Sequence, residues 1–264
     1  MSVGSAAVGL HGFEVVSNGE VAEGVFRLVL RSPDVARSIV PGQFMNLRVP
    51  GDASHILRIP LSFSHADAQA GTVEVVYAVV GEGTGRLSLM RAGKRSDLIG
   101  PAGTGWRGGA SGRALLVAGG VGAPPLVAAA GMLAKEGAAF DAILGAQSAS
   151  RLWGRECLLE LGAGTVTTTT DDGTAGLRGL TTDAMAQLLA ARTYAQVYTC
   201  GPAPMMAGVA RLAAVHDIAC QVSCEQLMGC GFGVCACCNV RAAHGGYKSC
   251  CTDGPVFDAR EVVL

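Results

Sequence analysis

The stretch LLVAGGVGAPPL, residues 115–126, decides the fold of the central part of the chain. Its first residues form an apolar run that is typical of a buried strand. Glycines at positions 119, 120 and 122 then permit a tight turn, and two adjacent prolines suit the first turn of a helix. The stretch therefore predicts a buried strand, a glycine turn and a buried helix.

Strand-like and helix-like segments alternate along the residues that follow. Predicted strands cover residues 114–120, 141–147, 165–170 and 196–202, and predicted helices cover residues 124–137, 155–161, 181–190 and 204–217. This alternation indicates a doubly wound parallel sheet, whose ligand lies at the carboxyl ends of the strands. We assign residues 109–217 to this α/β domain, with the linker WRGGASG, residues 106–112, as its boundary.

The residues before that linker are rich in strands. β-Branched runs separated by Gly, Pro, Asn and Asp occupy residues 13–19, 25–32, 43–49 and 72–80. Strands at this spacing, without long helical patterns between them, predict a small antiparallel β-barrel over residues 1–108. A short helix is expected to follow residues 83–84.

Composition excludes some classes of function. A formal net charge of −1 argues against nucleic acid, which demands a basic face. The low charged fraction, 16%, also indicates a face that another subunit covers. Residues 1–13 lack the basic start and apolar core of a signal peptide, so we expect a cytoplasmic protein. The uncharged run 114–134 is long enough to span a bilayer, but its glycines and prolines would break a spanning helix, so we expect no membrane segment.

Cysteine placement gives the strongest chemical signal. Ten cysteines are present, and eight of them lie within residues 220–251, which favours cluster ligation over disulfides in a reducing compartment. The run Cys230-Gly-Phe-Gly-Val-Cys235-Ala-Cys-Cys238 has the spacing C-x4-C-x2-C of a plant-type [2Fe–2S] cluster, and Cys250 or Cys251 supplies a fourth thiolate. Residues 218–264 have too little apolar periodicity for a core of their own, so we expect a small module held together by its cluster.

A zinc ribbon is the main alternative for this segment. It needs two C-x2-C knuckles, and only Cys235 and Cys238 form one here. Surplus cysteines at 220, 224 and 237, together with whichever of 250 and 251 is not a ligand, are expected to be small, semi-buried residues.

Two glycine-containing motifs indicate a nucleotide site in the α/β domain. The turn at Gly120 and Gly122 reads G-x-G-x-x-P, and such a turn lets backbone amides and a helix N-terminus face a pyrophosphate. Cys200-Gly-Pro follows a predicted strand, at the edge where the ligand of the sheet is expected. Each motif alone is weak, because glycine turns also serve packing and a lone buried cysteine is usually structural.

A third group of residues indicates a flavin site in the barrel. Arg58 offers a positive charge for a diphosphate, and Ser62 offers a hydroxyl near a flavin ring. Gly83 and Thr84 stand at a helix start, which suits a phosphate. Taken singly these residues are ordinary: Arg58 fits a surface charge, and the Gly-Thr pair fits a helix cap.

In chain order, these motifs together resemble a ferredoxin-reductase-type flavoprotein and, more narrowly, the electron-transfer subunit of class 1B dihydroorotate dehydrogenase. The resemblance covers nearly the whole chain, and the cluster loop followed by C-x-D-G-P-V-F is its most specific part. The matching segments are residues 41–50, 57–63, 79–85, 98–103, 115–126, 169–179, 198–206, 224–238 and 251–262.

The resemblance implies three domains and an electron relay. These domains are a β-barrel that binds FAD, a doubly wound domain that binds nicotinamide nucleotide, and a C-terminal [2Fe–2S] module. In that family, as the resemblance implies for this chain, a partner subunit with FMN oxidises dihydroorotate, and electrons pass through the cluster and FAD to NAD+. The family pattern implies a heterotetramer and makes Cys251 the fourth ligand. It assigns FAD contacts to Arg58, Pro60, Leu61, Ser62, Tyr77, Gly83 and Thr84, and nucleotide contacts to Gly120, Gly122 and Cys200.

One departure from the family pattern leaves the flavin site and the subfamily open. Ile59 stands where the family usually has a second arginine that faces the flavin diphosphate, so either Arg58 takes over that role or FAD is held more weakly. Related relay subunits serve ferredoxin:NADP+ transhydrogenases and sulfhydrogenases. The residues themselves do not decide between NAD and NADP: no acidic residue for a ribose follows the second α/β strand, and Arg151 could face a 2′-phosphate. The resemblance favours NAD.

Overall fold

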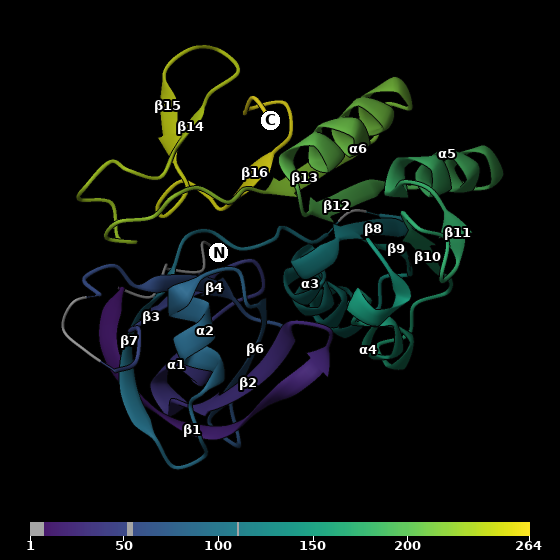
Figure 1. Ribbon diagram of the computed structural model, residues 1–264. Helices are drawn as coiled ribbons and strands as arrows, with labels where there is room; N and C mark the ends of the chain where they lie inside the picture. Colours follow the sequence, from purple (N-terminus) through teal and green to yellow (C-terminus); the bar gives the residue numbers. More distant parts are fainter. Residues whose placement is uncertain (1–7, 52–54, 110) are drawn as a thin grey trace.

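A computed structural model describes residues 8–51, 55–109 and 111–264 (Figure 1). Two sheets and a loop-rich C-terminal segment make up the fold, which is the predicted combination of an antiparallel half-barrel, a parallel α/β sheet and a C-terminal cluster domain. Residues 1–7, part of the stretch that lacks a signal-peptide pattern, lie outside the described residues, as does Ala110 of the predicted linker.

The first sheet is antiparallel and curls around its own core. Its strand order is β4-β3-β7-β1-β2-β6-β5. The strands are β1 (Gly9–Ala22), β2 (Val25–Arg31), β3 (Phe44–Leu47), β4 (Ile59–Ser62), β5 (His65–Asp67), β6 (Thr72–Ala78) and β7 (Arg95–Ala102). Helix α2 (Glu82–Ser88) begins before the Gly-Thr pair and contains it in its first turn, rather than following it, and α1 (Pro33–Ser38) is a short helix that the sequence pattern missed.

The second sheet has the order β11-β10-β9-β8-β12-β13-β16. All of its pairs are parallel except β13 with β16. Its strands are β8 (Ala114–Gly119), β9 (Phe140–Ala146), β10 (Val166–Thr170), β11 (Leu177–Arg178), β12 (Gln196–Cys200), β13 (Ala219–Ser223) and β16 (Val256–Asp258). Its helices are α3 (Ala123–Lys135), α4 (Arg155–Glu160), α5 (Thr181–Ala191) and α6 (Ala203–Val215), with single turns η1 (Gly120–Gly122) and η2 (Ala149–Arg151).

Alternate residues of β8 face the two helical layers of this sheet. Leu115 and Val117 pack in the core under α5 and α6, whereas Leu116 and Ala118 pack in the core under α3 and α4. The two helix pairs lie on opposite faces of the sheet (Figure 1). A strand covered on both faces explains why the run at 115–118 is continuously apolar.

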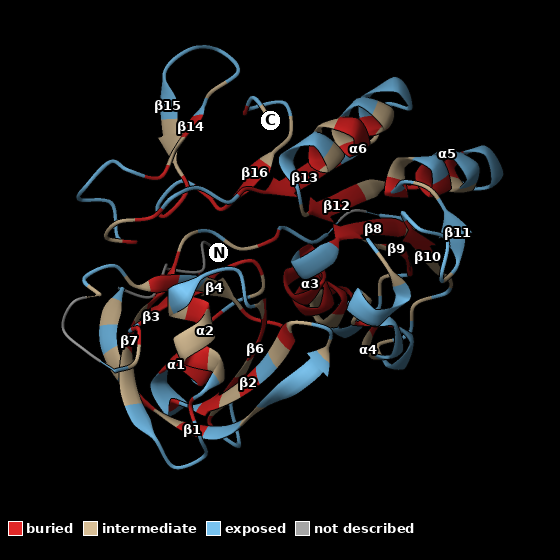
Figure 2. Ribbon diagram, in the orientation of Figure 1, coloured by how far each residue is buried: buried red, intermediate tan, exposed pale blue. Residues whose placement is uncertain are grey.

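The C-terminal segment shares its core with the α/β sheet. Strand β13 pairs with β12, and β16 forms the edge of that sheet, although both strands lie beyond residue 217, so the sheet crosses the predicted domain boundary. The segment adds only the hairpin β14 (Asn239–Arg241) and β15 (Tyr247–Ser249). Buried residues run along the central strands, and exposed ones follow the outer turns of this segment (Figure 2). The domain limits at 108 and 217 remain predictions.

The uncharged run at residues 114–134 forms β8, η1 and most of α3, as the glycine and proline pattern predicts. Within the described ranges, no helix has both the length and the apolar character that crossing a membrane requires.

Candidate iron–sulfur, flavin and nucleotide sites

The predicted cluster cysteines lie in two pairs. The backbone N–H of Cys230 donates to Cys235 Sγ at 3.4 Å, and that of Cys251 donates to Cys238 Sγ at 3.4 Å. Among the described residues, no three His, Cys, Asp or Glu side chains form a group that could hold a single metal ion. Two pairs of thiols suit the two irons of a [2Fe–2S] cluster better than the single ion of a zinc site.

The backbone of the loop is shaped around the sulfur of Cys230. Gly231 and Gly233 have φ of +80° and +91°, values that residues with a Cβ rarely adopt. This curvature turns the N–H groups of Phe232 and Val234 toward Cys230 Sγ, at 3.5 and 3.3 Å. Partial burial opposes ionisation, but N–H groups of the loop outweigh it and lower the pKa of the Cys230 thiol to about 6. A thiolate is the form that binds iron.

Five other cysteines of the segment are more enclosed than Cys230, whereas Cys235 and Cys237 are exposed. Burial, together with the neighbouring Cys238, raises the pKa of the Cys251 thiol to about 12. Cys250 is fully buried, near Cys224, and its backbone N–H donates to the Cys238 carbonyl at 2.8 Å. Of the two candidates for fourth ligand, Cys251 is therefore the one whose thiol contacts Cys238. Cys220 and Cys224 are buried and Cys237 is exposed.

The cluster segment is tied to the half-barrel. Thr104 N–H donates to the Gly254 carbonyl at 2.6 Å, and Thr104 Oγ1 donates to the Val256 carbonyl at 3.2 Å. Phe44 and Ala102 of the barrel belong to the same buried core as the cysteines of the segment. These contacts fix the cluster loop relative to the barrel.

The predicted nucleotide residues meet at the switch point of the α/β sheet. The chain proceeds from β8 to β9 and β10 on one side, whereas β12 pairs with β8 on the other side. A Cβ on Gly122 would fall 2.1 Å from the Cys200 carbonyl oxygen, so only glycine allows η1 to approach the end of β12. Ligands of doubly wound sheets bind at this kind of crevice. Gly120, with φ of +55°, is exposed at the same edge.

The thiol of Cys200 is buried and lies near an acidic residue, Glu225. Burial raises its pKa well above the usual range, and Glu225 acts in the same direction. Glu225 itself is solvent-accessible, although desolvation by the protein around it raises its pKa, so its carboxyl lies at the rim of the interior. Sequence reasoning missed Glu225, because an isolated glutamate before a cysteine loop carries no spacing signal.

Strands β3 and β4 present two different faces. Met45 and Leu47 pair with Leu61 and Ile59, and all four pack in or against the barrel core. The alternate positions therefore point out of the barrel, because side chains of a strand alternate between its faces. They are Phe44, Asn46, Pro60 and Ser62. The predicted flavin residues Pro60 and Ser62 thus share an outer face, whereas Leu61 does not.

Two other predicted flavin residues have structural partners. The Tyr77 ring is 2% exposed in the barrel core, its hydroxyl lies 3.3 Å from Asn18 Oδ1, and burial raises its pKa to about 12. The Tyr77 side chain therefore faces away from the surface. Thr84 Oγ1 accepts the N–H of Val80 at 3.0 Å and of Gly81 at 3.2 Å, which is the geometry of a helix cap.

The side chains of Arg58 and Ile59 have different surroundings. Arg58 is committed to Asp97, whose carboxylate accepts from its Nη2 at 2.6 Å and also pairs with Arg48 at 2.8 Å. Ile59 is 9% exposed and lies against the start of α2, where a Cβ on Gly83 would be 3.4 Å from its Cγ1. Position 59, rather than Arg58, adjoins the predicted phosphate-binding turn.

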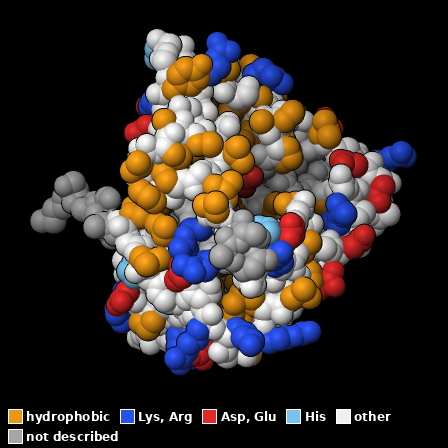
Figure 3. Space-filling model, turned by 60° about the vertical axis from the view of Figure 1, so that its left-hand side comes forward, with side chains coloured by type: hydrophobic (Ala, Val, Ile, Leu, Met, Phe, Trp, Pro, Cys, Tyr) orange, Lys and Arg blue, Asp and Glu red, His pale blue; other side chains and the backbone are white. Residues whose placement is uncertain are grey.

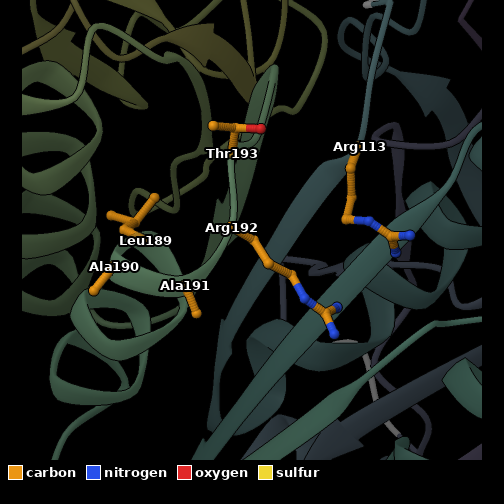
Figure 4. A pocket seen from close by; sticks show the side chains of 6 residues that line it. All are labelled: Arg113, Leu189, Ala190, Ala191, Arg192 and Thr193. Carbon is orange, nitrogen blue, oxygen red and sulfur yellow. The ribbon is translucent and has the colours of Figure 1, made fainter.

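A hollow of about 610 Å³ lies at the opposite edge of the α/β sheet, lined by Arg113, residues 189–191, Arg192 and Thr193 (Figure 4). Both arginines pair with the fully buried Asp141, at 3.2 and 2.9 Å. Tyr194 donates to the same carboxylate at 2.9 Å. Because Asp141 lies near the start of β9, this network is at the amino ends of the strands, away from the nucleotide residues, and its role is to neutralise a buried carboxylate.

Comparisons with known proteins agree with this geometry. Residues 225–263 match the family model for the iron–sulfur cluster binding domain of dihydroorotate dehydrogenase B. The dihydroorotate dehydrogenase B (NAD(+)) electron transfer subunit of Bacillus caldolyticus is 37% identical over 264 residues, covering 97% of this chain and 100% of the relative. That of Desulforamulus reducens is 34% identical over 92% of this chain and 94% of the relative.

Solved structures place the fold in the same group. The structure of an NADH-dependent reduced ferredoxin–NADP oxidoreductase, described for flavin-based electron bifurcation, is 32% identical with a TM-score of 0.88, over 99% of this chain and 91% of that chain. The ferredoxin reductase of carbazole 1,9a-dioxygenase, 19% identical, shares the fold with a TM-score of 0.68, over 81% of this chain and 68% of that chain.

These findings support FAD, a [2Fe–2S] cluster and NAD(H) as the cofactors, and they favour the dihydroorotate dehydrogenase relay over the other relays and the zinc module. An electron transfer subunit works with a catalytic partner. The chain belongs to the family of dihydroorotate dehydrogenase B (NAD(+)) electron transfer subunits.

Proposed function

We propose that this chain connects the FMN of a catalytic dihydroorotate dehydrogenase subunit to NAD+, within a cytoplasmic heterotetramer. Cys230 and Cys235 would hold one iron of the [2Fe–2S] cluster, and Cys238 and Cys251 the other. Pro60, Ser62 and the start of α2 would face FAD, and the edge of the sheet where Gly122 meets Cys200 would receive the nicotinamide nucleotide.

The observation that carries this proposal is the contact of the cluster loop with the barrel. Gly231, next to the first predicted ligand, lies against Asn46 of β3, on the outer face that also carries Pro60 and Ser62. A cluster in this loop would therefore lie close to a flavin on that face. Electron transfer between two centres requires such proximity. A structural zinc site would have no need to lie close to a flavin.

Different residues of the chain would serve the cluster, the flavin and the nucleotide. FAD, when bound, exchanges single electrons with a cluster and electron pairs with nicotinamide. The N–H groups of Phe232 and Val234 stabilise negative charge on Cys230. The glycines at 120 and 122 let the backbone approach a pyrophosphate, and Cys200 is buried beside Gly122.

The partner would cover the cluster loop. Leu227, Phe232 and Val234 are 74%, 42% and 77% exposed, and the ligand Cys235 is exposed among them. Hydrophobic side chains gather on this side of the molecule, beside a group of Lys and Arg side chains (Figure 3). Apolar residues exposed together favour a protein interface, and a partner there would shield the cluster and shorten the electron path.

Activity with and without a partner tests the proposal. The isolated chain should oxidise NADH with an artificial acceptor, because that needs only FAD and the nucleotide crevice. It should show no dihydroorotate-dependent NAD+ reduction until an FMN-containing catalytic subunit is added. Dihydroorotate turnover by this chain alone would contradict the relay. NADH oxidation without coupling to any such catalytic subunit would contradict the proposed partner.

A further inference from the structure

The side chain of Asn46 is buried without a hydrogen-bond partner for its amide nitrogen. Asn46 is 2% exposed, and its Nδ2 has no partner among the described residues. Only one other buried side-chain atom in the described ranges, Thr181 Oγ1, shares this property. A buried donor without an acceptor is destabilising, so Asn46 is expected to find its acceptor in something that the chain binds.

The amide of Asn46 is directed at the cluster loop. A Cβ built on Gly231 would fall 1.7 Å from Asn46 Nδ2 and 2.8 Å from its Cγ. Gly231 follows the ligand Cys230, and its φ of +80° turns the loop at this point. Position 231 thus excludes a side chain for two reasons, the backbone conformation and the amide of a different domain.

No carbonyl, carboxylate or thiol of the described residues accepts a hydrogen bond from this amide. The neighbouring N–H groups of Phe232 and Val234 already point to Cys230 Sγ, so the inner side of the loop is the side that donors face. A protein carbonyl within reach would have satisfied Nδ2, and none among the described residues does so. A cluster held by Cys230 would add sulfur acceptors on this side.

We propose that Asn46 Nδ2 donates a hydrogen bond to a sulfur of the cluster or of its Cys230 ligand, and that this bond raises the reduction potential of the cluster. The inference rests on the proposed cluster site. Reduction adds one electron and hence negative charge to the cluster, and a donor stabilises the reduced form more than the oxidised form. Asn46 would act on the cluster directly, although it belongs to β3 of the barrel and not to the cluster segment.

The test is the midpoint potential of the cluster in the full chain, measured by redox titration with electron paramagnetic resonance. Asn46→Leu removes the donor with little change in volume. At a fixed solution potential it should lower the ratio of reduced to oxidised cluster by roughly tenfold, which corresponds to about 59 mV for a one-electron couple. Asn46→His keeps an N–H at similar reach and should stay near the parent potential.

A matched control separates this role from packing. Gln43 is also a buried amide beside β3, but its Nε2 donates to the Gly103 carbonyl at 2.8 Å and its Oε1 accepts the Val40 N–H at 3.0 Å. Gln43→Leu should lower thermal stability and leave the potential unchanged. If Asn46→Leu does not fold, the β-branched Asn46→Val replaces it in the titration.

The outcomes distinguish the inference from the proposed function. A parent chain that binds no iron and sulfide would contradict both. A parent with a cluster whose potential is the same after Asn46→Leu or Asn46→Val would overturn the role of Asn46 alone. An equal shift in Asn46→Leu, Asn46→His and Gln43→Leu would also overturn it, because a general loosening of the barrel would then be the cause.

Discussion

The cluster loop and the flavin face of the barrel differ in how much of their chemistry is visible in side chains. In the cluster loop, thiols at fixed spacing are the proposed ligands, and the fold pairs Cys230 with Cys235 and Cys238 with Cys251. On the barrel, several predicted flavin residues already have partners within the protein: Arg58 with Asp97, Tyr77 with Asn18, and Thr84 with its own turn.

This difference shows which kinds of site a sequence motif can assign to particular side chains. A metal cluster needs particular side-chain atoms, so its ligand set is written in the spacing of the cysteines. A flavin dinucleotide is held largely by backbone groups and shape, so a motif residue can serve the turn that binds it rather than touch it. Single substitutions should therefore have their largest effect in the cluster loop and smaller effects in the barrel.

The largest effect is expected at a ligand of the cluster. Cys235→Ser should abolish cluster binding and unsettle the C-terminal segment, because ligation and local folding share one free energy there. Iron and acid-labile sulfide measure it. The nearby exposed Cys237 is the control, and Cys237→Ser should keep both. Full iron and sulfide in Cys235→Ser would disprove the ligand assignment.

A large effect is also expected where the glycine turn meets β12. Gly122→Ala places a Cβ 2.1 Å from the Cys200 carbonyl oxygen, which should cost about 3 kcal/mol in unfolding free energy and weaken NADH binding. In α3, Gly131 has open space around its Cβ position, so Gly131→Ala should be neutral or stabilising by up to about 1 kcal/mol. Chemical denaturation and NADH oxidation kinetics compare the two; equal behaviour would refute the close approach.

A gain is expected at the position that departs from the family pattern. Ile59 packs in the barrel core and lies against Gly83 at the start of α2, so the longer side chain of Ile59→Arg must turn out of that core to reach a diphosphate there. A charge-assisted hydrogen bond of roughly 1.5–3 kcal/mol would tighten FAD about ten- to hundredfold. Flavin retention through dilution and gel filtration measures the change, with Ile59→Leu as the control. Weaker FAD in Ile59→Arg would show that this side chain does not face the phosphates.

The smallest effect is expected at the helix cap. Thr84→Ala removes the oxygen that accepts from Val80 and Gly81 and should lower the unfolding free energy by about 1 kcal/mol. Thr84→Ser retains a hydroxyl and should lose less. If FAD affinity fell strongly while stability did not change, Thr84 would be a direct flavin contact instead of a cap.

Local patterns predicted much of the fold. The strand, turn and helix at residues 115–126 and the half-barrel followed from apolar runs, glycines and prolines. The entry of β13 and β16 into the α/β sheet did not, because edge pairing joins residues that are distant in sequence. The same limit applies to the site: cysteine spacing predicted the ligand set, but the Arg58–Asp97 pair and the approach of Asn46 to Gly231 depend on which surfaces the fold brings together.

The most direct test of the relay measures both of its halves in one cluster-free protein. Cys235→Ser, reconstituted with FAD and a catalytic partner under anaerobic conditions, is given NADH in one experiment and dihydroorotate with NAD+ in another. Our account predicts that NADH still reduces the flavin of this chain, because η1 and β12, which carry the predicted nucleotide residues, contain none of the predicted cluster ligands. It also predicts that dihydroorotate no longer reduces NAD+. Dihydroorotate-dependent NAD+ reduction at the parent rate, without iron, would contradict the relay.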